Sequence, residues 1–342
     1  MKNKLSTLAL SYFTFRASFI GITTNILINE FKQNSWITFL VSGSFSFVYV
    51  LLIYFLALKI KKRKILSEIK NTYPRIGTYI TYLIEIPIFL LTILNFFNLI
   101  DLISIQFLYK TPKIIISIIL IIPIYYLSRS SNNSFKITVL LLFYLNIILY
   151  VFSFIGLFSK INITNILPIN FEIKTSLLSP IVFNTIPLFM LLSLPNIDIN
   201  KNFIYGFILA FLSELITLFV MISILGIDLI RLFKYPEFLI LKLAFDGIIN
   251  VRLQNILGIQ FILDMIVFTS IGLKYTYETI KINKKIVFPI MLIIIIYYLN
   301  INYLKIYNIF INFLQYILLI TIPFISIILL IKKRELNSLK NN

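Results

Sequence analysis

The chain has 342 residues and contains no cysteine and no histidine. This double absence excludes disulfide bonds, metal sites built on thiolate or imidazole ligands, and catalysis by a cysteine or histidine side chain. Glycine is also scarce, with nine residues, and the sequence has no Walker, GxSxG or HExxH motif. We therefore expect a protein that is not an enzyme and that holds no metal or other cofactor.

Charged residues are few as well, at 13% of the chain, whereas hydrophobic residues make up 59% and the mean hydropathy is +0.97. Soluble domains usually carry about 25% charged residues. A soluble fold cannot bury this much apolar surface, and the continuous apolar runs lack the alternation of a membrane β-barrel. The composition predicts an all-α polytopic membrane protein whose residues 1–342 form a single transmembrane domain.

Ten apolar runs are long enough to be membrane spans. The third is long and must tilt, and the fourth is short and is expected to end near Pro123. The approximate ranges of the ten spans are 5–28, 36–58, 76–108, 113–128, 134–157, 176–194, 202–226, 254–280, 284–300 and 308–331.

The net charge of +18 would suggest a nucleic-acid partner in a soluble protein. In a membrane protein, basic residues instead collect in cytoplasmic connections. With the N-terminus inside, the inner connections hold 20 Lys and Arg and the outer ones hold 10. This bias predicts that both termini are cytoplasmic and that nucleic acid is not a partner.

The longest connection, 227–253, is then external and mixes apolar residues with charged ones. This pattern suits short amphipathic helices that lie on the outer face or plug a vestibule. A loop resting on the bilayer surface fits the pattern equally well.

Two spans are interrupted by small, polar or proline residues near mid-membrane, where freed backbone groups are tolerated only if they line a cavity. The interruptions occupy matching positions in two halves of five spans. An odd number of spans per half makes the halves inverted, so the pattern predicts an inverted-repeat transporter fold with its site at the midplane. The repeats would cover about 5–157 and 176–331, although each break taken alone could be a proline kink. The interrupting residues are Ala17, Ser18 and Gly21 in span one and Pro180, Asn184, Thr185 and Pro187 in span six.

Charged residues inside spans cost about 2.5–3.5 kcal/mol each and usually face a cavity or a partner. A rise of about 1.5 Å per residue places Arg16, Glu214 and Asp264 at similar depths. We expect Arg16 to pair with one of these carboxylates, because it stays in the membrane whether or not a ligand is bound. The alternative is that Arg16 receives a ligand carboxylate. The predicted buried charge network comprises Arg16, Glu85, Glu214 and Asp264.

Three stretches in order identify a family: Lys32–Trp36 (KQNSW), Ile163–Ile169 (ITNILPI) and residues 231–253 (RLFKYPEFLILKLAFDGIINVRL). Together they resemble the B subunit of spore germinant receptors, a family within the amino acid/polyamine/organocation transporter superfamily. The resemblance covers nearly the whole chain, from span one to the tail. The residues of the last stretch that fit the family pattern are Arg231, Tyr235, Pro236, Lys242, Gly247, Arg252 and Leu253.

This resemblance implies a ten-helix, five-plus-five fold with broken helices one and six, located in the inner membrane of a bacterial spore. It also implies a complex with an A subunit and a lipoprotein C subunit, and recognition of a small nutrient such as an amino acid. The chain departs from the family pattern in helices one, six and eight, which leaves the ligand's identity open. The implied ligand-binding residues are Arg16, Ala17, Ser18, Gly21, Leu94, Asn95, Asn184, Thr185, Ile186, Ser270 and Lys274.

A germinant-sensing subunit is thus the expected function, with an amino acid permease as the alternative. The sequence separates these two poorly because a sensor can reuse a transporter fold. A lipid-linked glycan flippase or polymerase would also fit the hydropathy, but it does not fit the ordered motifs.

Overall fold

The computed structural model describes residues 2–59, 74–168, 180–181, 190–191, 194, 200–245 and 253–279. These residues are helical with short connections, and none of them is in a strand. Five of the described segments are long and apolar enough to cross a membrane, so the chain is a membrane protein. They are Leu5–Leu52, which contains a break and a turn, and Glu85–Gln106, Asn132–Phe158, Lys201–Ile230 and Leu253–Glu278.

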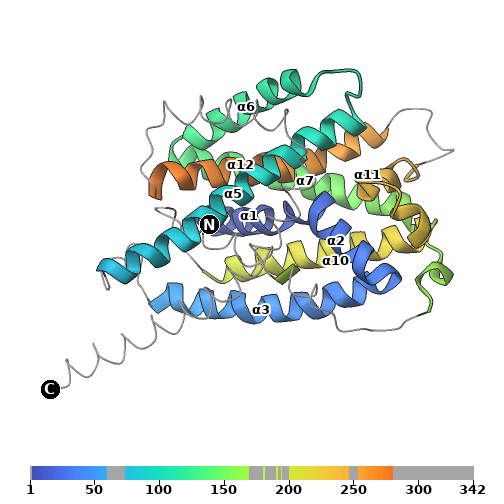
Figure 1. Cartoon of the computed structure of the whole chain (residues 1–342), viewed down its shortest axis with the longest axis horizontal. Coiled ribbons are helices and arrows are strands. Elements are labelled where there is room, and N and C mark those ends of the chain that lie inside the picture. Colours follow the sequence, from blue (N-terminus) through green and yellow to red (C-terminus); the bar gives the residue numbers. More distant parts are fainter. Residues whose placement is uncertain are drawn as a thin grey trace.

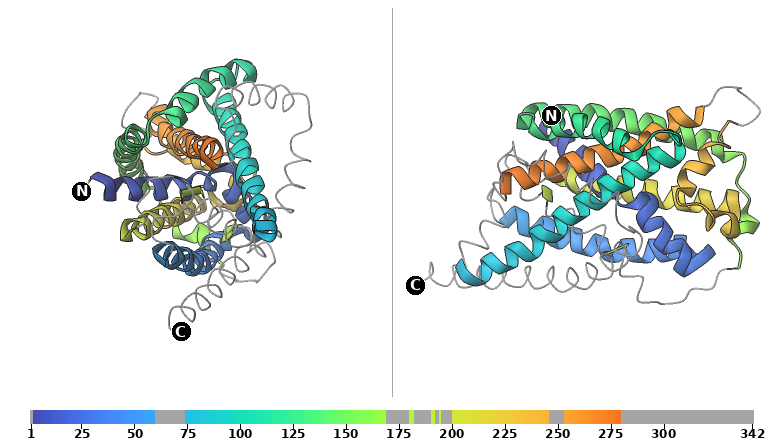
Figure 2. Two further views of the ribbon diagram at one scale, coloured as in Figure 1. Left: turned by 90° about the vertical axis from the view of Figure 1, so that its left-hand side faces the viewer. Right: turned by 45° about the horizontal axis from the view of Figure 1, so that its top comes forward.

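The described helices form one bundle, with α1 in its interior between α7, α10 and α12 (Figure 1). The long helix α5 crosses the bundle diagonally, as its predicted tilt requires (Figure 2). The elements are α1 (Lys2–Arg16), η1 (Phe19–Thr23), α2 (Thr24–Phe31), η2 (Lys32–Asn34), α3 (Ser35–Lys59), α5 (Pro74–Gln106), α6 (Lys113–Arg129), α7 (Asn132–Phe158), η3 (Ile163–Ile166), α10 (Lys201–Ile230), α11 (Pro236–Leu241) and α12 (Leu253–Thr279).

Close packing of α1 against α10 depends on small residues at the contact. A Cβ atom on Gly206 would lie 2.4 Å from the carbonyl oxygen of Leu8. Ser11 donates a hydrogen bond to the carbonyl oxygen of Phe203 at 2.7 Å. Small residues let helix backbones approach in an apolar medium, and a hydroxyl then bonds across the contact. Helix α1 is therefore held at the centre of the bundle.

The predicted break in span one is present. Helix α1 ends at Arg16, and η1 contains two residues with non-helical backbone, Ile20 and Gly21. Gly21 has a φ of 67°, a conformation that glycine adopts without steric cost. The hydroxyl of Thr23 donates to the Ser18 carbonyl and the backbone N–H of Thr24 donates to the Phe19 carbonyl, so both of these carbonyls are satisfied.

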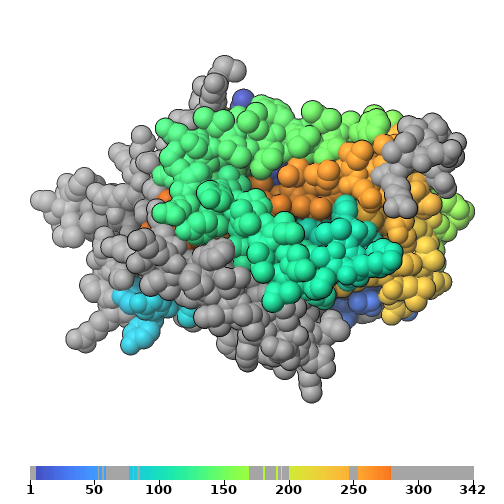
Figure 3. Space-filling model, turned by 90° about the horizontal axis from the view of Figure 1, so that it is seen from above, coloured from blue at the N-terminus to red at the C-terminus, as the bar shows by residue number. Residues whose placement is uncertain are grey.

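The outward faces of α6 and α7 carry large exposed apolar side chains, as contact with lipid tails requires. They include Ile119 and Ile122 on α6 and Leu141, Ile148 and Ile155 on α7. Figure 3 shows these two helices on one face of the molecule, with α12 partly visible between them.

Several expected span boundaries agree with the helices. Span four was expected over 113–128 and α6 covers Lys113–Arg129, although the helix runs through Pro123 and does not end near it. Membrane helices tolerate proline since neighbouring groups satisfy the freed carbonyl. Span seven was expected to end at 226, and Gly226 does interrupt α10 with a φ of 69°. Spans nine and ten, and nearly all of span six with its Asn184, Thr185 and Ile186, lie outside the described residues.

Candidate functional site

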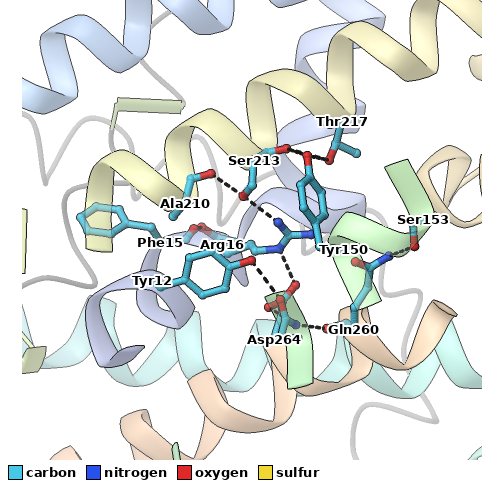
Figure 4. A network of polar contacts seen from close by, with 12 residues as sticks. Tyr12, Phe15, Arg16, Tyr150, Ser153, Ala210, Ser213, Thr217, Gln260 and Asp264 are labelled. Atoms are coloured by element: carbon cyan, nitrogen blue, oxygen red, sulfur yellow. Dashed lines mark hydrogen bonds and ion pairs between the residues drawn. The ribbon is translucent and has the colours of Figure 1, made fainter. Parts of the chain in front are cut away.

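Arg16, the last residue of α1, lies at the centre of a buried polar network (Figure 4). Its Nε donates to Oδ2 of Asp264 at 2.7 Å, and its Nη1 donates to the Ser213 hydroxyl at 2.6 Å. The guanidinium carbon also lies 4.7 Å from the centre of the Tyr150 ring, within the range of a cation–π contact. Arg16 is 2% exposed and the Asp264 side chain is 0% exposed. The partner of Arg16 is thus a protein carboxylate, as expected, and that carboxylate is Asp264.

The other oxygen of Asp264 is held by α7. Asn146 donates from Nδ2 to Asp264 Oδ1 at 3.0 Å and to the Gln260 carbonyl at 2.8 Å. The Asn146 Oδ1 in turn accepts a hydrogen bond from the Tyr12 hydroxyl at 2.9 Å. The Tyr150 hydroxyl donates to the carbonyl of Ser213 at 2.7 Å. This network therefore ties α1, α7, α10 and α12 together, and its ion pair is hydrogen-bonded on both sides.

Glu214 and Glu85 do not join this ion pair. Glu214 is buried on α10, but its neighbour Ser213 is the residue that contacts Arg16. The Oε1 atom of Glu214 has no hydrogen-bond partner in the described part of the chain. Glu85 is buried on α5, a helix that contributes no residue to the network around Arg16. The direct ion pair among the described residues is Arg16–Asp264, Glu214 lies close enough to interact electrostatically with both, and Arg16 is already occupied as a site for a ligand carboxylate.

A small cavity lies beside this network, between α7, α10, α11 and α12. Its lining includes Tyr150, Ser153, Thr217 and Gln260. The cavity offers about 20 Å³ to the centre of a water molecule, and about 10–15 Å³ is enough to hold one. The Oε1 atom of Gln260 has no hydrogen-bond partner among the described residues. A single water is therefore the occupant that the cavity fits.

A second polar site is formed at the break in span one. The backbone N–H of Gly21 donates to Oε1 of Glu237 at 3.0 Å, and the Thr24 hydroxyl donates to the same oxygen. Glu237 belongs to α11 and is 0% exposed. Its carboxyl group thus lies beside the N-terminal end of α2, where the helix dipole favours an anion.

The second oxygen of the Glu237 carboxyl group, Oε2, is buried and lacks a hydrogen bond in the described part of the chain. Burial raises the pKa of Glu237 above its ordinary value, and the hydrogen bonds from Thr24 and Gly21 oppose this increase only in part. The contact therefore holds one carboxylate oxygen and leaves the second without a partner.

Two residues shortly before Glu237, Lys234 and Tyr235, pack against the break and α5. The Tyr235 hydroxyl donates to Oδ1 of Asn98 at 2.8 Å, and Asn98 Nδ2 donates to the Ile20 carbonyl at 2.7 Å. The Tyr235 ring lies so close to Gly21 that an added Cβ would be 2.4 Å from Cε1. Lys234 contacts Asp101 at 2.5 Å, which fixes the segment to α5.

Residues 235–238 of the 227–253 connection therefore agree with the plug alternative, whereas 231–233 just before them are exposed. Tyr235 and the α11 residues Pro236, Glu237 and Phe238 are buried within the protein, whereas a loop resting on the bilayer surface would expose them. Residues 246–252 lie outside the described residues.

The side-chain amide of Asn95, on the α5 face near the break, is buried without a hydrogen-bond partner among the described residues. Asn95 is 1% exposed, and both atoms of the amide, Oδ1 and Nδ2, are without a partner in this part of the chain. It lies one helical turn from Asn98, which contacts the break, and one turn from Thr92, which faces Gly272 of α12. The expected site residue Asn95 is therefore on the α5 face between the break and α12.

Four other expected site residues are buried near or beyond this region. Ala17 and Ser18 directly follow α1, and the Ser18 carbonyl accepts from Thr23. Leu94 is buried beside Asn95, and the Ser270 hydroxyl donates to the Ile266 carbonyl within α12. These residues carry no polar contact that by itself identifies a ligand.

The ammonium of Lys274, an expected pocket residue, bonds to the end of α6. Lys274 donates to the Ser130 carbonyl at 2.8 Å, at the end of α6. The first residue of α6, Lys113, contacts Asp101 near the plug at 2.6 Å. Since α6 has 17 residues, the two ends are roughly 24 Å apart. Lys274 therefore caps a carbonyl at the C-terminal end of α6, away from Asp101 and the plug.

Glu237 and Thr24 were not identified as site residues by the sequence pattern. The only signal was the acidic residue directly after Tyr235 and Pro236 in the third motif stretch. Asn146, inside an apolar run, was a further unused signal for the Arg16 network. The three motif stretches come together at one end of the bundle, where η2 contacts η3, α10 contacts both, and α11 contacts α10 (Figure 1).

No family model matches the chain, and no curated protein sequence matches it at a significant level. Function must therefore be argued from the two polar sites and from the ordered motifs.

Proposed function

We propose that this chain is the nutrient-sensing membrane subunit of a spore germination receptor, built on a ten-helix, five-plus-five transporter fold. Its ligand is a small nutrient, an amino acid above all, and its site lies at the break in span one. The resemblance carried by the motif stretches, including Lys32–Trp36 and Tyr235–Pro236, supports this assignment. Binding without covalent chemistry agrees with the lack of Cys, His and nucleophile motifs.

The observation that carries the proposal is the pairing of the break with the unsatisfied amide of Asn95. A buried amide without partners is destabilising by about 1–3 kcal/mol, so such groups persist where a ligand or water completes them. An amino acid offers a carboxylate for the Gly21 backbone N–H and the Thr24 hydroxyl at the break. Its ammonium group is a donor that suits the Asn95 Oδ1. These two anchors match the two ends of the same small molecule.

The proposed setting follows the charge bias and the resemblance. The protein would lie in the spore inner membrane with both termini cytoplasmic, because the inner connections hold twice the basic residues of the outer ones. Its partners would be an A subunit and a lipoprotein C subunit. In this orientation α11 and the break face the outer side, where a nutrient arrives.

A self-sufficient amino acid permease remains a second candidate because of Glu214. This carboxylate is buried near Arg16 and Asp264 but does not pair with Arg16, so the three groups include one more acid than base. A permease driven by protons requires a buried acid that changes its charge during transport. Uptake of labelled amino acids by proteoliposomes containing the purified chain would separate the candidates: a sensor binds without accumulation, whereas a permease accumulates substrate.

The test of the sensing function is genetic. Spores that lack the gene are complemented with the wild type, with Asn95→Ala, or with Asn133→Ala as a control at an exposed site. We expect the nutrient concentration for half-maximal germination to rise at least tenfold in Asn95→Ala, with equal protein amounts, and to be unchanged in the control. Normal sensitivity of Asn95→Ala, or wild-type spores that respond to no amino acid, would refute the assignment.

A further inference from the structure

The break in span one already binds a carboxylate, and that carboxylate comes from the protein itself. Oε1 of Glu237 accepts from the Gly21 backbone N–H at 3.0 Å and from the Thr24 hydroxyl. Gly21 and Glu237 are 216 residues apart in the sequence, so this is not a local helix cap. The contact shows that a backbone N–H and a hydroxyl at the N-terminal side of α2 converge on one carboxyl oxygen.

Glu237 uses only one of its two carboxylate oxygens at this position. Its Oε2 atom is buried and unpartnered, and Asn95 next to the break is buried with both amide atoms unpartnered in the described residues. A helix cap that served stability alone would be expected to satisfy both carboxylate oxygens, because an unsatisfied buried oxygen is costly. The site therefore has more hydrogen-bonding capacity than Glu237 uses.

We propose that Glu237 is an internal competitor, whose carboxylate holds the anion-binding position of the break until the carboxylate of a small ligand displaces it. This inference rests on the function proposed above and defines its ligand class as molecules that carry a free carboxylate. A ligand of this class would take the Gly21 N–H and the Thr24 hydroxyl from Glu237. Its remaining polar group would bond to Asn95.

We expect displacement of Glu237 to move α11 as well, because Tyr235, two residues away, lies against Gly21 at the same contact. Helix α11 has six residues and contacts α10 and α12 as well as η1. The exchange of one carboxylate for another therefore changes the position of a helix that touches both partners of the Arg16 network. Ligand binding would then be converted into a movement of α11, without any net change of charge at the break.

Equilibrium binding tests the competition. The full-length chain in lipid nanodiscs is titrated with each of the twenty amino acids, and with ethylamine as a probe that lacks the carboxylate of alanine. The variants are Glu237→Ala, Glu237→Gln, which keeps an oxygen for the Gly21 N–H, and Glu30→Gln, which removes an exposed acid from α2. If Glu237 occupies the site nine-tenths of the time, its removal tightens binding about tenfold.

We expect at least one amino acid to bind Glu237→Ala about tenfold or more tightly than the wild type, with Glu237→Gln intermediate and Glu30→Gln equal to the wild type. Ethylamine should gain nothing from the substitution. Wild-type binding that is equal to or tighter than that of Glu237→Ala would overturn the competition while leaving the proposed function intact. Binding of no amino acid to any of the four proteins would overturn the proposed function and this inference with it.

A second measurement keeps Glu237 in place, in case the variants fold poorly. The chain has no native cysteine, so Ile240→Cys introduces one buried thiol on α11. Lys242→Cys, at an exposed position, gives the reference rate. We expect an impermeant maleimide to modify Ile240→Cys several times faster when the bound amino acid is added, and Lys242→Cys at a constant rate. An unchanged Ile240→Cys rate at saturating amino acid would show that α11 stays in place and would refute the displacement.

Discussion

Replacement of Arg16 by methionine tests whether the central network is structural. The substitution removes the Nε donor to Asp264 and the Nη1 donor to Ser213. Ser213 also donates to the Ala210 carbonyl at 2.7 Å, so its hydroxyl keeps a partner. Asp264 keeps only the hydrogen bond from Asn146 at 3.0 Å and becomes a buried acid without a counter-charge. Such a loss is destabilising by about 3–5 kcal/mol.

The assay is the amount of folded protein in membranes, together with the midpoint of thermal unfolding in detergent. We expect Arg16→Met to lower both strongly. Addition of Asp264→Asn should restore about half of the loss or more, because the stranded charge is then gone. Glu214→Gln is the matched control, since it removes a buried acid beside Ser213 that does not bond to Arg16. Rescue by Glu214→Gln rather than by Asp264→Asn, or full accumulation of Arg16→Met alone, would refute the pairing.

Three further predictions concern single sites. Burial raises the pKa of Glu237, so the native state binds more protons than the unfolded state; thermal stability should therefore fall as the pH rises through the raised pKa, and this dependence should be absent in Glu237→Gln. Gly206→Ala should destabilise by about 1–3 kcal/mol because its Cβ would meet the Leu8 carbonyl of α1, and a lower unfolding midpoint would show this. Lys274→Met should lower stability while leaving the nutrient concentration for half-maximal germination unchanged, since Lys274 caps α6 and does not reach the break; a tenfold change in that concentration would contradict this.

Much of the Arg16 site could be predicted from depth alone. Counting residues along the spans placed Arg16, Glu214 and Asp264 at one level, and one of the two acids is the partner. Depth does not specify direction, because adjacent residues on a helix point about 100° apart. Ser213 faces Arg16, and so the side chain of the next residue, Glu214, points elsewhere. Only the packing of α10 and α12 around α1 decides this choice.

The Glu237 site could not be predicted in the same way. In the sequence, Glu237 follows Pro236 and looks like an exposed acid in the first turn of an amphipathic helix. Its burial depends on complementarity to a break more than two hundred residues earlier in the chain. The break itself was predictable, because Ala17, Ser18 and Gly21 interrupt an apolar run. Nothing in the local pattern around Glu237 indicates which distant surface covers it.

Hydrogen-bond saturation, rather than charge, distinguishes the roles of the two polar sites. Arg16 is the most conspicuous polar residue of span one, yet both of its bonded nitrogens and both oxygens of Asp264 have protein partners. A ligand carboxylate at Arg16 would have to break an ion pair that is already complete, and would leave Asp264 stranded. At the break, Glu237 Oε2 and the Asn95 amide have no partners among the described residues, so a ligand there would add hydrogen bonds. We therefore expect a ligand to bind at the break, while the Arg16 network holds α1 in place beside it.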